Sequence, residues 1–111
     1  MNVYDTANIL ATEIKQSEEY VNYKMAKQAI NLNSELKKEI EEFDKLRYEI
    51  QLEMMQTGNT DENKNKQLQN KYAELVENLD AKKFFEAETK FNILIADVNK
   101  IIGEAIRDVM Q

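Results

Sequence analysis

The sequence predicts an all-α protein, and three observations support that prediction. The 111 residues include no proline and only two glycines, Gly58 and Gly103, whereas sheets and their tight turns depend on both residue types. The chain is rich in Glu, Lys, Leu, Ala, Gln and Met, which favour helices. Its last third carries apolar residues at helical spacing. We therefore expect an elongated antiparallel helical bundle of about five helices with a long C-terminal helix.

The C-terminal helix, expected over residues 81–109, carries the broadest apolar face of the chain. One stripe has alternating spacings of three and four residues and comprises Phe84, Ala87, Phe91, Leu94, Val98, Ile101 and Ala105. At about 1.5 Å per residue this helix is roughly 43 Å long. That length exceeds the diameter of a compact domain of this size, about 34 Å. Part of the face therefore extends beyond the chain's other helices, and we expect a homo-oligomer, with a dimer favoured.

Two short helices are expected before residue 31, near 5–16 and 17–30. Asp5 or Thr6 can accept hydrogen bonds from the free amides at the start of the first helix. Ser17 can cap the second helix, because Glu18 and Glu19 follow it at once and suit a helix N-terminus.

The third and fourth helices, near 34–57 and 61–78, are expected to form an antiparallel hairpin. Asn33 or Ser34 can cap the third helix, and Gly58 can end it in the left-handed conformation. The connection over residues 57–60 is short enough to reverse the chain, with Thr60 as the next cap. Asp80 can cap the final helix. We treat residues 1–111 as a single helical domain.

The composition indicates which partners the protein can bind and in which compartment it works. The formal net charge is −6, and an acidic chain repels phosphate backbones, so direct nucleic-acid binding is not expected. No apolar run approaches the roughly 20 residues that a membrane span needs, and the first 20 residues do not resemble a secretory signal. The absence of cysteine fits a reducing compartment. We expect a cytoplasmic protein.

Catalytic chemistry is missing from the sequence. Histidine and cysteine are absent, and the only two serines stand at expected helix caps. No glycine-rich phosphate loop or metal-ligand spacing occurs. Glu35 with Glu39 is one of the carboxylate pairs one helical turn apart, but such pairs are common on solvated helix faces. We therefore predict no catalytic residue, no cofactor and no metal site.

The candidate site is the C-terminal helix, as core or as oligomer interface. Phe84, Phe85 and Phe91 favour core packing over a peptide-binding groove. Glu88 lies beside the apolar face, and pairing with a lysine is favoured over a role as a partner-facing anchor. The full candidate set is Phe84, Phe85, Ala87, Glu88, Phe91, Leu94, Val98, Ile101 and Ile102.

Four local patterns resemble one known family over nearly the whole chain. They are Val3-Tyr4-Asp5-x-Ala7 with Leu10, then Ser17-Glu18-Glu19-Tyr20, then Leu36-Lys37-Lys38 leading to Glu42-Phe43, and finally Phe84-Phe85-x-Ala87-Glu88 followed by Phe91. The chain resembles the YlbF/YmcA family of small helical bacterial regulators, and within it the YheA-like short branch. Some members carry cysteines that help to hold an iron–sulfur cluster. This chain has none, so cluster binding is not carried over.

The resemblance implies a non-enzymatic regulatory or adaptor protein that acts through helix-mediated association. Characterised relatives regulate competence, sporulation and biofilm development, and they form a complex that adjusts RNA processing by the endoribonuclease RNase Y. Protein partners of an RNA-processing complex are therefore implied. Two alternatives stay open at this point. One is a nucleic-acid-binding protein that uses Lys64, Lys66 and Lys71 of the fourth helix, and the other is a purely structural helical oligomer.

Overall fold

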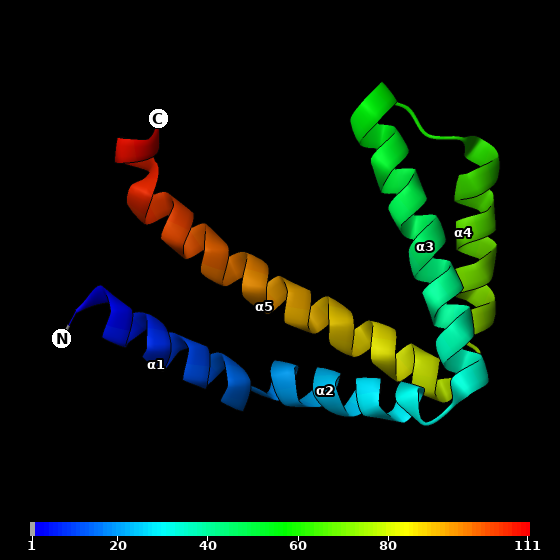
Figure 1. Cartoon of the computed structure of the whole chain (residues 1–111), viewed down its shortest axis with the longest axis horizontal. Coiled ribbons are helices and arrows are strands. Elements are labelled where there is room, and N and C mark those ends of the chain that lie inside the picture. The colour runs from blue at the N-terminus through cyan, green and yellow to red at the C-terminus, as the bar shows by residue number, and fades with distance from the viewer. Residues whose placement is uncertain (1) are drawn as a thin grey trace. The chain divides into compact units, whose positions relative to one another are not determined.

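A computed structural model describes residues 2–111 and shows an all-α protein (Figure 1). Five helices and no strand occur within this range, which confirms the predicted fold class and the long C-terminal helix. The bounds of the helices are α1 Val3–Gln16, α2 Glu18–Asn31, α3 Ser34–Thr57, α4 Glu62–Leu75 and α5 Leu79–Met110.

The helices group into two compact units. The terminal unit comprises Met1–Lys27 with Phe84–Gln111, and the hairpin unit comprises Gln28–Lys83. The boundaries fall inside α2 and α5, so these helices contribute residues to both units. The single domain expected over residues 1–111 stays a prediction.

In the terminal unit, α1 begins earlier than the sequence predicted. Asn2, and not Asp5 or Thr6, is the N-cap, because its side-chain oxygen accepts a hydrogen bond of 2.9 Å from the Asp5 amide. Asp5 then lies inside the first turn, where its negative charge interacts favourably with the helix dipole. Ser17 separates α1 from α2 as predicted, since its hydroxyl accepts a hydrogen bond from the Tyr20 amide at 3.2 Å.

The hairpin unit is built on α3 and α4, which lie side by side (Figure 1). Asn33 caps α3 by accepting from the Leu36 amide, and Gly58 ends it with φ +77°. A residue with a Cβ is disfavoured in that left-handed conformation. The Phe43 and Tyr72 rings pack across the hairpin with centroids 6.0 Å apart. The buried apolar residues of this unit are Ile30, Leu36, Ile40, Phe43, Leu75 and Ala81.

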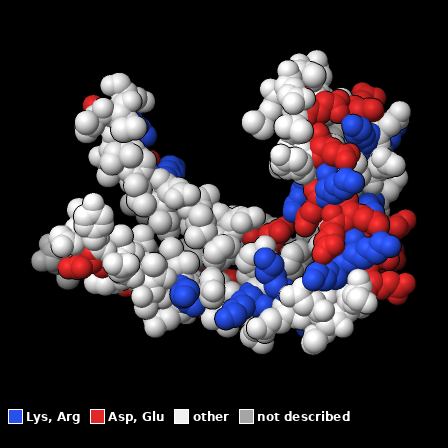
Figure 2. Space-filling model, viewed as in Figure 1, with Lys and Arg blue, Asp and Glu red and all other residues white. Residues whose placement is uncertain are grey.

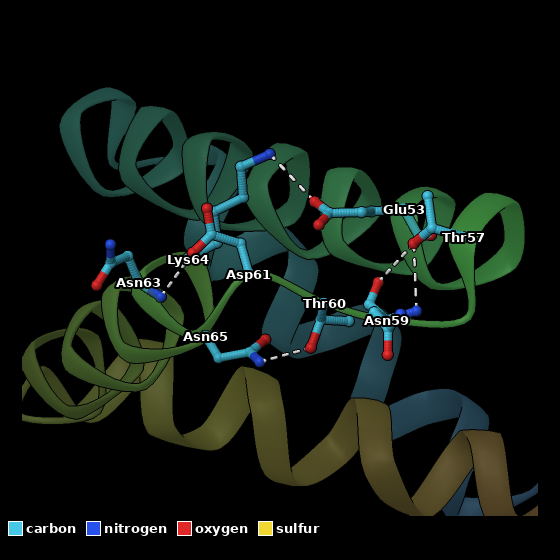
Figure 3. A network of polar contacts seen from close by, with 8 residues as sticks. All are labelled: Glu53, Thr57, Asn59, Thr60, Asp61, Asn63, Lys64 and Asn65. Carbon is cyan, nitrogen blue, oxygen red and sulfur yellow. Dashed lines mark hydrogen bonds and ion pairs between the residues drawn. The ribbon is translucent and has the colours of Figure 1, made fainter.

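At the hairpin tip, the cap of α4 also differs from the prediction (Figure 3). Asp61 is the N-cap and accepts from the Asn63 amide at 2.8 Å. Thr60 was the predicted cap, but its hydroxyl accepts instead from the Asn65 side chain at 2.7 Å. Because Asp61 directly precedes the first helical residue, its carboxylate is the closer acceptor for the free amides.

A break separates α4 from α5, and it falls earlier than the sequence predicted. Helix α4 ends at Leu75, and α5 begins at Leu79 instead of Ala81. The Asn78 side chain accepts from the amides of Asp80 and Ala81, at 2.9 and 3.2 Å. Asn78 therefore does the capping that the sequence assigned to Asp80, which lies within the first turn. An amide oxygen at the preceding position satisfies two free N–H groups at once.

Candidate protein-interaction surface

The apolar stripe of α5 changes from buried to exposed along its length. Phe84, Phe85 and Ala87 are buried, and the exposed fraction of Phe84 is 6%. Glu88, Phe91, Leu94 and Val98 are half-buried. Ile101 and Ile102, the last two members of the predicted set, are exposed, with Ile101 at 69%. The structure thus places the predicted residues on one helix face in three successive environments.

The exposed end of this stripe forms a continuous apolar surface. Every residue of α5 from position 101 onward is exposed. Five of these residues share the side of the helix that Phe91, Leu94 and Val98 occupy, by the 3.6-residue repeat. We call them the C-terminal face: Ile101, Ile102, Ala105, Ile106 and Val109.

Helix α1 shows the same change of environment along its length. Leu10 and Ile14 are half-buried, whereas Val3 lies on their side of the helix and is 80% exposed. Tyr4 is exposed to a similar degree. In Figure 1, α1 begins at the end of the terminal unit where α5 finishes, and the first turns of α1 lie apart from the last turns of α5. Each of the two helices therefore has an exposed apolar end in this unit.

An aromatic cluster holds α2 against α5 within the terminal unit. The Tyr23 ring centroid lies 5.7 Å from that of Phe84 and 5.5 Å from that of Phe91. Tyr20 packs on Phe91 at 6.0 Å. Rings at these separations gain energy beyond the area that they bury. The cluster explains why the N-terminal half of the α5 stripe is covered.

Tyr23 is the residue of this cluster that sequence reasoning missed. Its ring contacts two predicted core residues, and its hydroxyl reaches Glu88. The available signal was the spacing of Tyr20 and Tyr23, three residues apart on one helix face. A tyrosine pair alone does not distinguish a core position from an exposed one, because tyrosine occupies both.

Glu88 accepts a hydrogen bond from a tyrosine hydroxyl in this structure. Tyr23 Oη donates to Glu88 Oε2 over 3.4 Å, a long hydrogen bond. Lys27 Nζ lies 5.2 Å from the centroid of the Tyr23 ring on the same helix. Glu88 is therefore a half-buried polar group at the edge of the aromatic cluster.

Between residues 2 and 111, no three acidic side chains gather closely enough to hold a metal ion. Every buried side-chain nitrogen or oxygen there has a hydrogen-bond partner. Across the same residues, no helix is long and apolar enough to cross a bilayer.

The lysines of α4 are locally balanced by carboxylates of α3. Lys64 Nζ lies 3.4 Å from Glu53 Oε2, and Lys71 Nζ lies 3.1 Å from Glu42 Oε2. Figure 2 shows acidic and basic residues intermixed over α3 and α4, whereas α1 and the C-terminal part of α5 are mostly uncharged in this view. Two of the three lysines considered for nucleic-acid binding therefore form ion pairs within the hairpin.

The fold and the surface define a class of small, entirely helical proteins with an uncovered apolar helix face. The family model described as control of competence regulator ComK, YlbF/YmcA, matches residues 3–107. The chain belongs to this family, which confirms the resemblance seen in the sequence and gives the protein a regulatory role.

Bacterial relatives match over nearly their full length. A UPF0342 protein of Desulfitobacterium hafniense is 36% identical over 99% of this chain and 89% of its own. A UPF0342 protein of Clostridium novyi is 34% identical over 97% of this chain and 95% of its own. A third, of Symbiobacterium thermophilum, is 33% identical over 94% and 93%. The similarity therefore covers both units.

Proposed function

We propose that this protein is a non-enzymatic cytoplasmic regulator that acts as an adaptor, by binding other proteins through its helices. The observation that carries the proposal is the C-terminal face, five apolar side chains with no charged residue among them. Contiguous exposed apolar surface is a usual mark of protein interaction sites. Family membership supports a regulatory role for that interaction.

The proposed regulatory target is RNA processing, in bacterial development such as competence, sporulation and biofilm formation. The family description, which refers to control of the competence regulator ComK, supports the part of this proposal that concerns competence. The net charge of −6 favours a protein partner over RNA itself. An adaptor that binds a processing enzyme needs no catalytic group of its own.

Affinity capture from the native bacterium tests the adaptor role. The tagged wild-type chain is compared with Ile102→Lys, which places a charge on the C-terminal face, and with Ile93→Lys. Ile93 is a matched control, because it is also exposed on α5 but lies on the opposite side of the helix. We expect one or more specific proteins to be recovered with the wild type and Ile93→Lys and lost with Ile102→Lys.

The identity of those proteins tests the RNA-processing role. Recovery of a ribonuclease or its assembly factors, together with altered transcript ends in a strain lacking the protein, supports that role. Equal recovery with all three chains, or recovery of no specific protein, contradicts the adaptor proposal. Specific partners without any change in transcript ends contradict the RNA-processing role alone.

A further inference from the structure

We infer that the hairpin unit carries a second interaction surface, on the C-terminal part of α3, which binds a basic amphipathic helix of a partner protein. The surface consists of Tyr48, Leu52 and Met55, and we call it the tip face. Their spacing of four and three residues places them on one side of α3. The tip face lies on a different helix from the C-terminal face, so the inference goes beyond the proposed function.

The tip face is uncovered within the hairpin unit. Tyr48 is 63% exposed and Met55 83%, and the exposed Leu52 lies between them along the helix. On the same helix, Phe43 packs against Tyr72 of α4. At about 100° per residue, the tip face is turned by roughly 120–180° about the helix axis from Phe43. Helix α4 therefore packs on a different side of α3.

The shape and composition of the tip face favour a helix as its occupant. Apolar side chains at this spacing form a ridge that fits the groove of another helix. Met54, beside Met55 in sequence, is also exposed, at 48%. Methionine is unbranched and polarizable, and it is common on surfaces that receive the apolar side of amphipathic helices.

The charge at the tip of the hairpin favours a basic partner. Residues 48–63 include four carboxylates, those of Glu49, Glu53, Asp61 and Glu62, and no lysine or arginine. Glu53 is paired with Lys64 (Figure 3). Among residues 2–111, no ion pair involves the other three carboxylates. Their negative charge attracts a helix whose apolar stripe is flanked by lysine or arginine.

The basic residues that precede the tip face on α3 do not reverse this charge. Arg47 Nη2 lies 2.6 Å from Asp44 Oδ1. Lys45 follows Glu41 by one helical turn, and this order of charges is favourable within a helix. A second copy of the chain would set the same carboxylates against one another, and an anionic membrane surface would also be repelled. The charge therefore selects a basic protein segment.

A synthetic peptide serves as the probe. It has about 15 residues, with leucine at helical spacing and lysine at the other positions, and it carries a fluorophore for anisotropy with the purified full chain. We expect micromolar affinity, because few side chains take part, and binding that weakens as salt is added. A control peptide with glutamate in place of lysine is expected to bind at least about tenfold more weakly. Absence of binding, or equal binding of both peptides, overturns the inference.

Two leucine substitutions locate the binding surface. Leu52→Lys places a positive charge in the middle of the tip face and is expected to lower the affinity for the lysine peptide by about tenfold or more. Leu32→Lys is the matched control, because Leu32 is 90% exposed in the same unit but precedes α3. We expect Leu32→Lys to keep the wild-type affinity within about twofold. Circular dichroism checks the helix content, and equal losses for both variants overturn the inference.

The methionine methyl groups report the surface directly in the unsubstituted chain. With methyl-labelled methionine, NMR follows Met55 on the tip face, Met25 on α2 and Met110 at the end of α5. Single Met→Leu variants assign the signals. We expect the lysine peptide to shift the Met55 signal and to leave Met25 and Met110 in place. Equal shifts at all three overturn the inference, and so does a Met55 shift that follows chain concentration without peptide, which would reveal a second copy.

The outcomes separate this inference from the proposed function. Ile102→Lys, which alters the C-terminal face, is expected to bind the lysine peptide as the wild type does. If Ile102→Lys loses the peptide while Leu52→Lys keeps it, the peptide occupies the C-terminal face and the tip-face inference is overturned. The adaptor proposal then still depends only on the capture of partners from cells.

Discussion

The hydroxyl of Tyr23 on α2 lies 3.4 Å from a carboxylate oxygen of Glu88 on α5, and the Tyr23 ring packs between Phe84 and Phe91. This pair joins residues 65 positions apart in sequence. The ring and the hydroxyl contribute separately to stability, and substitutions can distinguish the two contributions.

Tyr23→Phe removes the hydroxyl and keeps the ring. Because the hydrogen bond is long and part-buried, we expect the free energy of unfolding to fall by less than about 1 kcal/mol. Tyr23→Ala also removes the two ring contacts, and we expect a loss of about 2–4 kcal/mol. Urea denaturation followed by circular dichroism measures both values. Equal losses for the two variants would contradict the assigned role of the ring.

Asn78→Ala is expected to destabilise the start of α5. Asn78 accepts hydrogen bonds from the amides of Asp80 and Ala81, so its loss should cost about 1 kcal/mol. Asp80→Ala is the matched control and removes only a favourable charge in the first turn, worth about 0.3–1 kcal/mol. Thermal or urea unfolding of the two variants gives the comparison. A larger loss of stability for Asp80→Ala than for Asn78→Ala would indicate that Asp80 is the cap, as the sequence predicted.

Substitution of alanine for each of the two glycines is expected to change the stability of the protein in opposite directions. Gly58 has φ +77°, where a Cβ is strained, so Gly58→Ala should cost about 1–2 kcal/mol. Gly103 lies within α5, and no heavy atom stands within 4 Å of a Cβ added there. Gly103→Ala should therefore stabilise the chain by about 0.5–1 kcal/mol. The shift in the urea midpoint measures both effects, and a destabilised Gly103→Ala would reveal a contact that limits space at that position.

The α4 lysines are expected to contribute little to RNA binding. Lys64 and Lys71 already lie near carboxylates, and the chain carries a net charge of −6. Fluorescence anisotropy with a labelled single-stranded RNA should show no binding that weakens steeply with salt. The double variant Lys64→Ala, Lys71→Ala should give the same result as the wild type. Salt-sensitive binding that this variant abolishes would favour the nucleic-acid alternative.

The caps show where local sequence is sufficient and where it is not. Ser17 and Gly58 were predicted correctly, and Asn33 was one of the two caps predicted for α3, because each stands at a clear interruption of the apolar pattern. Asn2, Asp61 and Asn78 replaced their predicted neighbours. Several residues with capping side chains lie within two or three positions of one another at these sites. Local propensity does not select among them, since the choice depends on where the backbone turns.

The candidate site was predictable as a stripe, although its environment was not. Phe84, Phe91 and Ile102 fall on one helix face by spacing alone. That Phe84 is buried and Ile102 exposed depends on α2, because the rings of Tyr20 and Tyr23 cover only the N-terminal half of the stripe. Sequence spacing carries no information about which neighbouring helix ends first.

By itself, the sequence determined that this protein is all-α, that α5 is long, and that most of the apolar residues of α5 lie on one face. Helical periodicity and the lack of proline are local properties that the chain expresses without reference to its neighbours. Only the tertiary structure decided that Phe84 is core and that Ile101 and Ile102 at the far end of α5 are uncovered. Burial depends on contacts between residues far apart in sequence, and the C-terminal face is defined by the absence of such contacts within the chain.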